Sequence, residues 1–393
     1  MKKLIIFLYC LSPFSFFAQT IISEHKNAGA FRIVAEGRGA TIIYDKEDDP
    51  LIQIAANLVA GDIQKVSGHT PKQLSAVSGT NDVILVGTIG KSKMIQQLIA
   101  AKKINVDQIK NKWEGYQIQI VKTPFKGIAQ ALVIVGNDKR GAAYGLFELS
   151  KQMGVSPWYW WADVPVKQKK AIYVQVKTPF VDAPKVKYRG IFINDEAPCF
   201  SGWTKEKFGG VNHLAYEKVF ELLLRLKANY LWPAMWGNAF NDDDKLNPIL
   251  ADKWGIVMGT SHHEPMQRSQ QEWRRYGSGA WDYEKNHSNL SDFWRDGIIN
   301  MGNHESLVTI GMRGDGDEPM TMLLYCCLMT TGEIFENFLK LAISQEVAVT
   351  GYIIISIMWE VLAIINGSIP ILFRGCGSKC IWLGSIRSDR FGL

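Results

Sequence analysis

The sequence has few cysteines, and they are unevenly placed. Cys10 lies near the N-terminus, and Cys199 is the single cysteine between residues 11 and 325. The other four are Cys326, Cys327, Cys376 and Cys380. They form no CxxC pair and have no histidine nearby, which argues against a zinc site and points to a different origin for this last stretch.

The sequence also lacks a run of basic residues, and its N-terminal apolar run is too short for a comfortable membrane span. The net charge of +6 is mild for 393 residues, and no cluster of lysine or arginine predicts a nucleic-acid partner. Residues 4–17 are apolar, follow Lys2 and Lys3, and precede the small-residue site Ala18-Gln19-Thr20. This predicts a cleaved signal peptide at residues 1–19, an exported protein in the periplasm or outside the cell, and no membrane contact after cleavage; an uncleaved anchor is the alternative.

The remaining composition is that of a globular protein, with 47% hydrophobic and 21% charged residues. Strand and helix patterns alternate over residues 20–178 and predict a small α/β domain. The predicted strands are 31–35, 41–44, 82–87, 116–121, 131–135 and 171–176, and the predicted helices are 50–66, 91–101 and 141–153. The segment 154–166 holds three tryptophans and a tyrosine, and we interpret it as a packed linker, with sugar stacking as the alternative.

A second pattern runs from residue 185 to residue 319. The predicted strands are 186–194, 230–235, 256–260 and 307–312, and the helices between them are 216–226, 246–253 and 290–301. Four strand–helix units in series imply parallel strands with crossover helices. The predicted fold class is therefore α/β, with the N-terminal domain followed by an incomplete (β/α)8 barrel.

Polar residues cluster just after each predicted barrel strand, where a parallel barrel carries its active site. They are Asp195, Glu196, Trp236, Asn238, His262, His263, Glu264, Arg313, Asp315, Asp317 and Glu318. Helix capping explains one or two of them but does not require a tryptophan or a histidine pair. Glycosidic cleavage needs two carboxyl groups, and Arg313 suits a substrate that carries its own carboxylate.

Two metal hypotheses compete with this interpretation. His262, His263 and Glu264 with the later aspartates could bind a catalytic metal, but no HxH or HExxH spacing is present. Residues 241–244 (NDDD) resemble the start of a calcium loop but lack its glycine and closing glutamate. We therefore predict neither metal nor cofactor.

Several stretches resemble glycoside hydrolase family 115, the xylan α-1,2-glucuronidases. They are GVSPWYWWADVPV (154–166), KYRGIFINDEAP (187–198), ANYLWPAMWGNAFNDDD (228–244), GIVMGTSHHEPM (255–266) and GMRGDGDEPM (311–320). Residues 136–150 are also similar to the first domain of family 67. The resemblance covers residues 20–318.

The resemblance implies an inverting hydrolase that releases glucuronic acid, or its 4-O-methyl ether, from glucuronoxylan or aldouronic oligosaccharides. Asp317 matches as a candidate catalytic carboxylate, Arg313 as the residue that holds the uronate, and Trp236 as a stacking platform. The further substrate-binding candidates are Asp195, Glu196, Asn238, His262, His263 and Asp315. Intact homologues would form homodimers.

The family pattern stops after Met320, and the Tyr-Lys-Glu-like motif that carries the family's proposed general acid is absent. If each codon of residues 321–336 is begun one base early, the genetic code permits DDVTLLLFDDNWGNIR, which resembles later barrel strands. We therefore interpret residues 320–393 as an out-of-frame tail and expect this chain to be inactive. Binding of acidic xylan fragments without cleavage is the alternative function, and a related barrel enzyme for another uronide or a hexosamine is a weaker one.

Overall fold

The computed structural model describes residues 20–77, 82–233, 237–261, 264–309 and 314–317. The predicted signal peptide and the predicted tail from residue 320 lie outside these residues. The chain divides into two units: unit 1 is Met1–Trp232 with Phe240–Met258, and unit 2 is Pro233–Ala239 with Gly259–Leu393. The predicted boundary between residues 178 and 185 lies within unit 1, and the predicted domain limits remain predictions.

A six-stranded sheet forms the centre of the N-terminal part of unit 1, in the order β10-β7-β8-β6-β4-β5. Its strands are β4 (Thr41–Tyr44), β5 (Gln73–Leu74), β6 (Asp82–Thr88), β7 (Tyr116–Lys122), β8 (Gln130–Gly136) and β10 (Phe180–Asp182). Strands β5, β4, β6 and β8 are parallel, whereas β7 is antiparallel to both β8 and β10. The two central strands, β6 and β8, are runs of valine, isoleucine and leucine that are buried on both faces.

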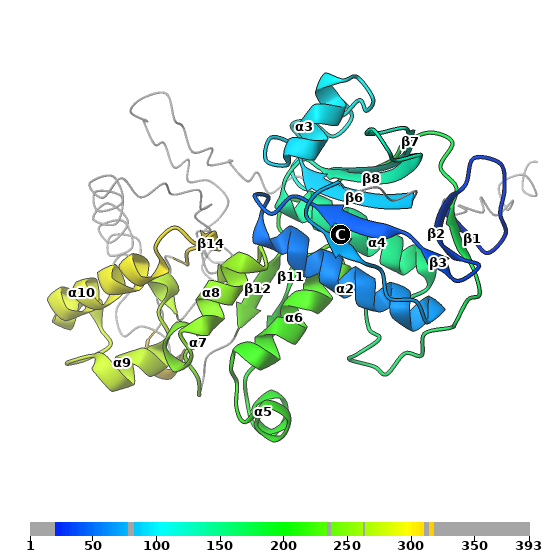
Figure 1. The fold of residues 1–393 in the computed structure, drawn as a ribbon. Helices are drawn as coiled ribbons and strands as arrows, with labels where there is room; N and C mark the ends of the chain where they lie inside the picture. The colour runs from blue at the N-terminus through cyan, green and yellow to red at the C-terminus, as the bar shows by residue number, and fades with distance from the viewer. Residues whose placement is uncertain (1–19, 78–81, 234–236, 262–263, 310–313, 318–393) are drawn as a thin grey trace, which may run out of the picture. The chain divides into compact units, whose positions relative to one another are not determined.

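Three helices cover this sheet. Helix α2 (Pro50–Ser67) and helix α4 (Lys139–Met153) pack together on one face, and α3 (Lys93–Ala100) lies on the other (Figure 1). Aspartate side chains accept backbone N–H groups at the starts of α2 and α4, and glycines with positive φ, Gly68 and Gly154, end them. These capping signals explain why the predicted helices 50–66 and 141–153 agree closely with the structure.

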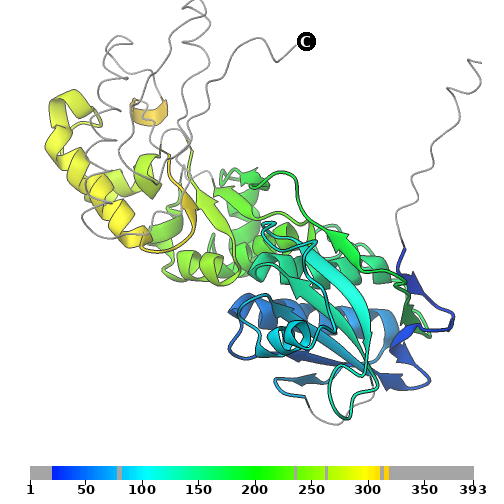
Figure 2. The ribbon, with the colours of Figure 1, turned by 90° about the horizontal axis from the view of Figure 1, so that it is seen from above.

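A small antiparallel sheet pairs strands from the beginning of this domain with a strand near its C-terminal end. Its order is β1-β9-β2-β3, with β1 (Ile22–Ser23), β2 (Phe31–Ala35), β3 (Arg38–Gly39) and β9 (Ile172–Val174). Figures 1 and 2 both place it at one end of the six-stranded sheet. The first strand thus pairs with the strand that follows the aromatic linker.

The second pattern begins within unit 1. Strands β11 (Gly190–Ile193), β12 (Tyr230–Pro233) and β13 (Val257–Gly259) follow one another in the sheet, and β12 pairs with β13 in parallel. The helices between them are α5 (Phe200–Phe208), α6 (His213–Arg225), α7 (Phe240–Asp243) and α8 (Leu246–Lys253). The predicted fold class is confirmed as an α/β domain followed by strand–helix units of barrel type; the described residues do not include a closed barrel.

Unit 2 contains η1 (Pro265–Gln267), α9 (Gln270–Tyr276), α10 (Tyr283–Met301), β14 (Ser306–Leu307) and η2 (Asp315–Asp317). Its core is aromatic: Trp281 forms edge-to-face pairs with Trp273, Phe293 and Trp294, and Trp273 forms one with Phe293, at centroid distances of 5.0–6.3 Å. Helix α10 begins at Tyr283 rather than at the predicted residue 290, and it is broken at Asn286. Among the described residues, no helix has both the length and the apolar character to cross a membrane.

Candidate active site

The predicted site residues fall into three groups in the structure. Asp195 and Glu196 follow β11 in unit 1, and Asn238 and Asp315 belong to unit 2. Outside the described residues lie Trp236, His262, His263 and Arg313, and also the side chain of Asp317. The convergence of the whole set on one rim therefore remains a prediction.

The two carboxylates after β11 differ in exposure. Asp195 is buried, with 3% of its surface exposed, whereas Glu196 is exposed. The Ser201 hydroxyl, on α5, donates to the backbone oxygen of Asp195, so the chain turns back over this residue. The peptide N–H of Glu196 donates to Asn194 Oδ1 at 3.4 Å. Glu196 is thus the member of the pair that solvent or a substrate can reach.

Glu264 closes the loop that follows β13. It is completely buried, and its Oε2 accepts the backbone N–H of Ser261 at 3.2 Å and the Ser261 hydroxyl at 2.9 Å. The Thr260 hydroxyl donates to the Glu264 carbonyl at 2.6 Å. These contacts give Glu264 a structural role in the loop after β13.

The loops after β13 and β14 meet within unit 2. The N–H of Met266 donates to the Thr309 carbonyl at 2.9 Å, and Gln267 Nε2 donates to the Leu307 carbonyl at 2.8 Å. Both Met266 and Gln267 have positive φ, 56° and 61°. Non-glycine residues rarely adopt this conformation, and such strain concentrates at functional loops.

Asp315 is tied to the beginning of α9. Its Oδ1 accepts a hydrogen bond from Gln270 Nε2 at 2.6 Å, although the Asp315 side chain is exposed. The structure therefore brings Asp315 next to the loop after β13, which is the adjacency that the barrel interpretation predicts for successive strands. Sequence reasoning missed Gln270, although the capping pattern Ser269-x-x-Glu272 predicts a helix start at this point.

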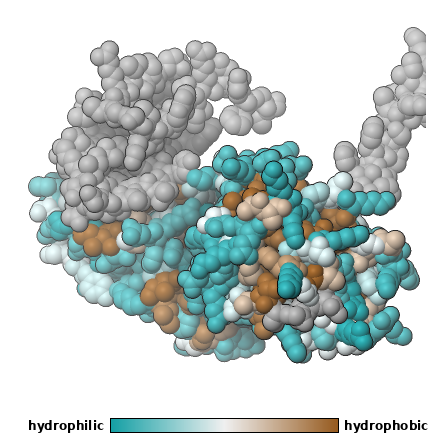
Figure 3. All heavy atoms as spheres, turned by 45° about the horizontal axis from the view of Figure 1, so that its top comes forward, coloured by the Kyte–Doolittle hydropathy of each residue, from teal (hydrophilic) through white to brown (hydrophobic). Residues whose placement is uncertain are grey.

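The aromatic segment 154–166 packs against helix α6. Tyr159 donates its hydroxyl proton to Glu221 at 2.9 Å, and Trp161 Nε1 donates to the Lys218 carbonyl at 3.2 Å. These contacts support the linker interpretation; among the aromatic residues of the segment, Trp158 is the exposed one, at 45%. On the face shown in Figure 3, hydrophilic side chains predominate among the described residues, and hydrophobic ones form separate patches.

The acidic run 241–244 is used for local structure. Asp244 accepts the backbone N–H of His213 at 3.0 Å and that of Leu246 at 2.9 Å, and it lies 2.6 Å from His213 Nδ1. Burial alone would raise the pKa of Asp244, but the hydrogen bonds from His213 outweigh it and lower that pKa. Within the described ranges, no three His, Cys, Asp or Glu side chains are grouped so that they could hold a metal ion.

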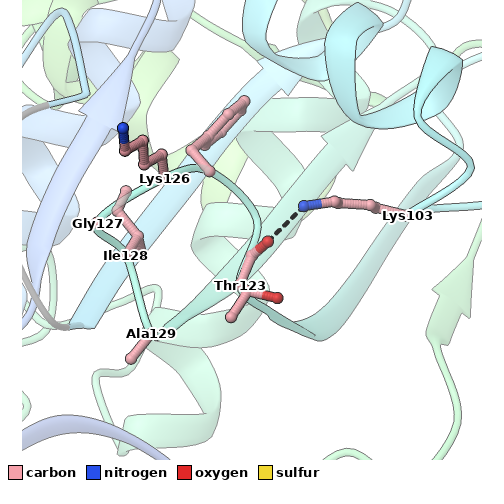
Figure 4. Close-up of a pocket in the computed structure, with 7 residues that line it drawn as sticks. Lys103, Thr123, Lys126, Gly127, Ile128 and Ala129 are labelled. Carbon is pink, nitrogen blue, oxygen red and sulfur yellow. Dashed lines mark hydrogen bonds between the residues drawn. The ribbon is translucent and has the colours of Figure 1, made fainter.

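A shallow hollow of about 460 Å³ lies at the turn between β7 and β8 (Figure 4). Lys103 Nζ donates to the Thr123 carbonyl, the bond drawn in Figure 4, and to the Pro124 carbonyl at 3.0 Å. The residues that line it are Lys103, Thr123, Phe125, Lys126, Gly127, Ile128 and Ala129. The hollow has no carboxylate and no predicted site residue, so it cannot supply the acid and base of glycosidic cleavage.

Comparisons with known proteins agree with the arrangement of strands and loops. Residues 181–351 match the sequence model of glycosyl hydrolase family 115, and residues 35–149 match that of the N-terminus of glycosyl hydrolase family 67. A solved structure described as a novel family GH115 4-O-methyl-alpha-glucuronidase, with specificity for decorated arabinogalactans, is 32% identical, with a TM-score of 0.68. This chain is a member of glycosyl hydrolase family 115.

The protein described here spans less than half the length of that relative, because the match covers 78% of this chain and 41% of the relative. The match to the family model ends at residue 351, beyond Met320, so its extent gives no support to a break in the family pattern at Met320. The out-of-frame interpretation of the tail remains a prediction.

Two more distant structures were also matched. A chitobiase from Flavobacterium johnsoniae is 14% identical, with a TM-score of 0.43 over 82% of this chain and 46% of that one. An N-acetyl-beta-hexosaminidase from Streptomyces plicatus is 9% identical, with a TM-score of 0.45 over 79% and 61%. Similarity at this level carries no argument about activity. The search of curated proteins found no match.

Proposed function

We propose that this family 115 chain derives from an exported α-glucuronidase that removes glucuronic acid, or its 4-O-methyl ether, from the side chains of a plant polysaccharide. The observation that carries the proposal is its 32% identity, with a TM-score of 0.68, to a protein described as a 4-O-methyl-alpha-glucuronidase. The polar strand ends support it, because acid–base cleavage of a uronide needs carboxyl groups and a cation at one rim.

The proposed roles of individual residues come from the resemblance to family 115. Asp317 is the candidate catalytic carboxylate, and Arg313 pairs with the uronate by a bidentate contact. Trp236 stacks on the sugar ring. Glu196, after β11, and Asp315 are the described candidate carboxylates with exposed side chains, so both are accessible to a substrate. An inverting reaction would place acid and base about 6.5–9.5 Å apart, with water between them.

Two polysaccharides should be compared as substrates. The sequence resemblance favours α-1,2 linkages on xylan, whereas the relative is described as specific for decorated arabinogalactans. We propose glucuronoxylan and aldouronic oligosaccharides as the ligands of this chain. We also propose that the chain as it stands binds them without turnover.

The test uses the full chain and a restored version, in which the reading frame is restored from codon 320 and the missing segment with the Tyr-Lys-Glu-like motif is supplied. Released uronic acid is measured by anion-exchange chromatography on aldouronic oligosaccharides and on decorated arabinogalactan, and calorimetry measures binding. We expect release by the restored chain only, binding by both chains, and an α-to-β change of anomer by NMR. Release by the present chain would refute its inactivity, and a restored chain that releases no uronic acid from either substrate would refute the glucuronidase proposal.

Two substitutions serve as internal controls in the restored chain. Asp317→Asn should reduce kcat by several orders of magnitude, because it removes a group that acts only in the transition state. Glu264→Gln should instead act through stability, because Glu264 is buried in its loop. Equal losses of kcat in both variants at unchanged stability would contradict the assignment of roles.

A further inference from the structure

Glu114 is a buried carboxylate of the N-terminal domain that lies at the starts of the barrel strands. Only 1% of its surface is exposed, and it precedes β7 by two residues. Its Oε1 accepts hydrogen bonds from Arg140 Nε at 2.6 Å and from Asn229 Nδ2, and its Oε2 accepts one from Arg189 Nη2. Arg189 immediately precedes β11, and Asn229 immediately precedes β12. One side chain therefore connects the beginnings of two neighbouring strands.

The two strand starts are also bonded to each other. Asn229 Oδ1 accepts the backbone N–H of Arg189 at 2.9 Å, and the N–H of Asn229 donates to the Arg189 carbonyl at 2.8 Å. The Arg189 guanidinium contacts both segments. Its Nη1 donates to the Val186 carbonyl, before β11, and its Nε donates to the Lys227 carbonyl, before β12, both at 2.7 Å. The backbone before β11 is thus fixed by side-chain contacts from both directions.

The third strand is reached through Arg140 and Asn229. Arg140 Nη1 donates to the Gly255 carbonyl, two residues before β13, at 3.1 Å. The Asn229 carbonyl accepts the N–H of Val257, the first residue of β13, at 2.8 Å. Glu114 and Arg140, both from the N-terminal domain, therefore contact the start of every barrel strand described in unit 1.

A tyrosine adds a fixed donor to this group. Burial first, and then the Glu114 carboxylate, raise the pKa of Tyr144. Its hydroxyl therefore keeps its proton and donates to the Ala228 carbonyl at 3.0 Å, while Arg189 Nη2 lies 3.2 Å from the same oxygen. The Glu114 carboxylate itself accepts hydrogen bonds from Arg140, Arg189 and Asn229, and hydrogen bonds that involve a charged group are the strongest kind.

Parallel strands need such a device because nothing else close in the sequence fixes their register. A hairpin turn sets the register of antiparallel neighbours, but β11, β12 and β13 are joined by long helical crossovers. Burial specifies register only where one face of a strand is covered. The four residues of β11 alternate between exposed and half-buried, so burial defines its register weakly.

We propose that Glu114 is a positioning residue: by clamping Arg189 and Asn229 it sets the register of β11 and β12. It thereby sets where the residues after β11, Asp195 and Glu196, stand at the other end of that strand. The inference rests on the proposed function only in naming that end as the site. The N-terminal domain then serves as the template on which the barrel sheet is aligned.

The test compares Glu114→Gln with a matched control, Asp62→Asn, in the full chain. Asp62 is completely buried in the same unit and accepts two hydrogen bonds from Arg225, but it contacts no strand start. Hydrogen–deuterium exchange is followed in peptides that cover residues 187–194 and 228–233, at temperatures equally far below each variant's own Tm. Glu114→Gln should speed exchange there by about tenfold or more over the control, because hydrogen bonds to charged groups are lost at these segments.

A second variant protects the test against misfolding. Arg189→Lys keeps the positive charge but loses the planar fork that reaches Glu114 and three carbonyl oxygens. Faster exchange confined to residues 187–194 is the expected result. Equal exchange in Glu114→Gln and Asp62→Asn, or a uniform rise across unit 1 in Arg189→Lys, would overturn the proposal.

Binding of aldouronic oligosaccharide provides the functional readout. If the proposed function is right, Glu114→Gln should weaken binding by about tenfold, while Asp62→Asn at matched stability should leave the Kd unchanged. If the parent chain binds no uronide, the proposed function fails, but the exchange experiment still decides the role of Glu114.

Discussion

The ion pair between Asp62 and Arg225 allows a quantitative prediction about how the N-terminal domain holds the barrel part of unit 1. Asp62 lies on α2 and Arg225 ends α6, 163 residues later. Arg225 Nη1 and Nη2 donate to the two carboxylate oxygens at 2.7 and 3.2 Å, and the Ser150 hydroxyl donates to Oδ2 at 2.7 Å. Both side chains are buried, with 0% and 5% of their surfaces exposed.

Two substitutions should have unequal costs. Asp62→Ala removes the carboxylate, but Arg225 keeps a second partner because its Nε donates to Glu221 at 2.8 Å. Arg225→Met removes the buried cation from two carboxylates at once: Glu221 loses the guanidinium, and Asp62 keeps only the partly exposed Lys65 as a cation. Breaking a buried pair costs about 3–5 kcal/mol, so we expect about 3 kcal/mol for Asp62→Ala and a larger loss for Arg225→Met.

Urea unfolding of the full chain, followed by tryptophan fluorescence and far-UV circular dichroism, measures both losses. For a unit of this size, 1 kcal/mol corresponds to about 2–4 °C in Tm, so Asp62→Ala should lower the Tm by about 6–12 °C. Lys65→Ala is the matched control, because Lys65 also contacts Asp62, at 3.2 Å, but has a side chain that is 40% exposed. It should cost less than about 1 kcal/mol.

The order of the losses refutes or supports the reasoning more sharply than their size. If Asp62→Ala cost no more than Lys65→Ala, the buried pair would not hold α2 to α6. If Arg225→Met were the milder change, the argument from unpaired buried carboxylates would be wrong.

Four further substitutions test other contacts of the fold. Burial opposes ionisation of Glu148, but the hydrogen bond from Lys227 outweighs burial and lowers the pKa of the carboxyl group. The ionised Glu148 therefore stabilises the fold above the unfolded pKa of 4.5, and this contribution is lost as the pH falls through the lower pKa of the folded state. Lys227→Met should therefore flatten the acid side of a plot of Tm against pH. In urea titrations, Gly145→Ala should cost about 1–3 kcal/mol, because a new Cβ would lie 2.5 Å from the core residue Ile134. Gly61→Ala is the control: a Cβ there meets no atom within 4 Å, so it should stabilise α2 by up to about 1 kcal/mol. Ser269→Ala removes a capping box and should cost about 1 kcal/mol in the same titrations, with faster hydrogen exchange confined to α9; loss of structure throughout unit 2 would contradict this.

Local patterns in the sequence were enough to predict most elements of the N-terminal domain. The helix predicted at 50–66 is observed as Pro50–Ser67, because its apolar spacing, its Asp49 cap and its Gly68 stop all agree. The direction of β7 could not be predicted in this way. Whether a strand joins a sheet in parallel or antiparallel is decided by which neighbour it finds, and β7 pairs antiparallel with β8.

The barrel strands are shorter in the structure than the apolar runs suggested. The strand predicted at 186–194 is observed as Gly190–Ile193, because the carbonyls of Val186 and Lys187 are bonded by the Arg189 guanidinium. Helix α5 was missed because FSGWTKEKF has almost no helical periodicity. Both errors come from contacts or packing that the local sequence pattern does not encode.

Candidate site residues were predictable by type, but their individual roles were not. Asp195, Glu196 and Glu264 look equivalent in the sequence, as carboxylates after strands. The structure separates them, because Asp195 and Glu264 are buried and Glu196 is exposed. The contacts of Glu114 were beyond prediction, since its partners Arg189 and Asn229 lie 75 and 115 residues away in the chain.

The two ends of β11 explain why such a distant contact matters for the site. A strand of four residues spans about 13 Å, and successive side chains point to opposite faces. A slip of one residue at the Arg189 end would therefore move the other end by about 3.3 Å and exchange the orientations of Asp195 and Glu196. The carboxylate that now faces outward would be buried, and the buried one would face outward. A side chain at the opposite end of the strand from the site thus decides which of two adjacent carboxylates is presented there.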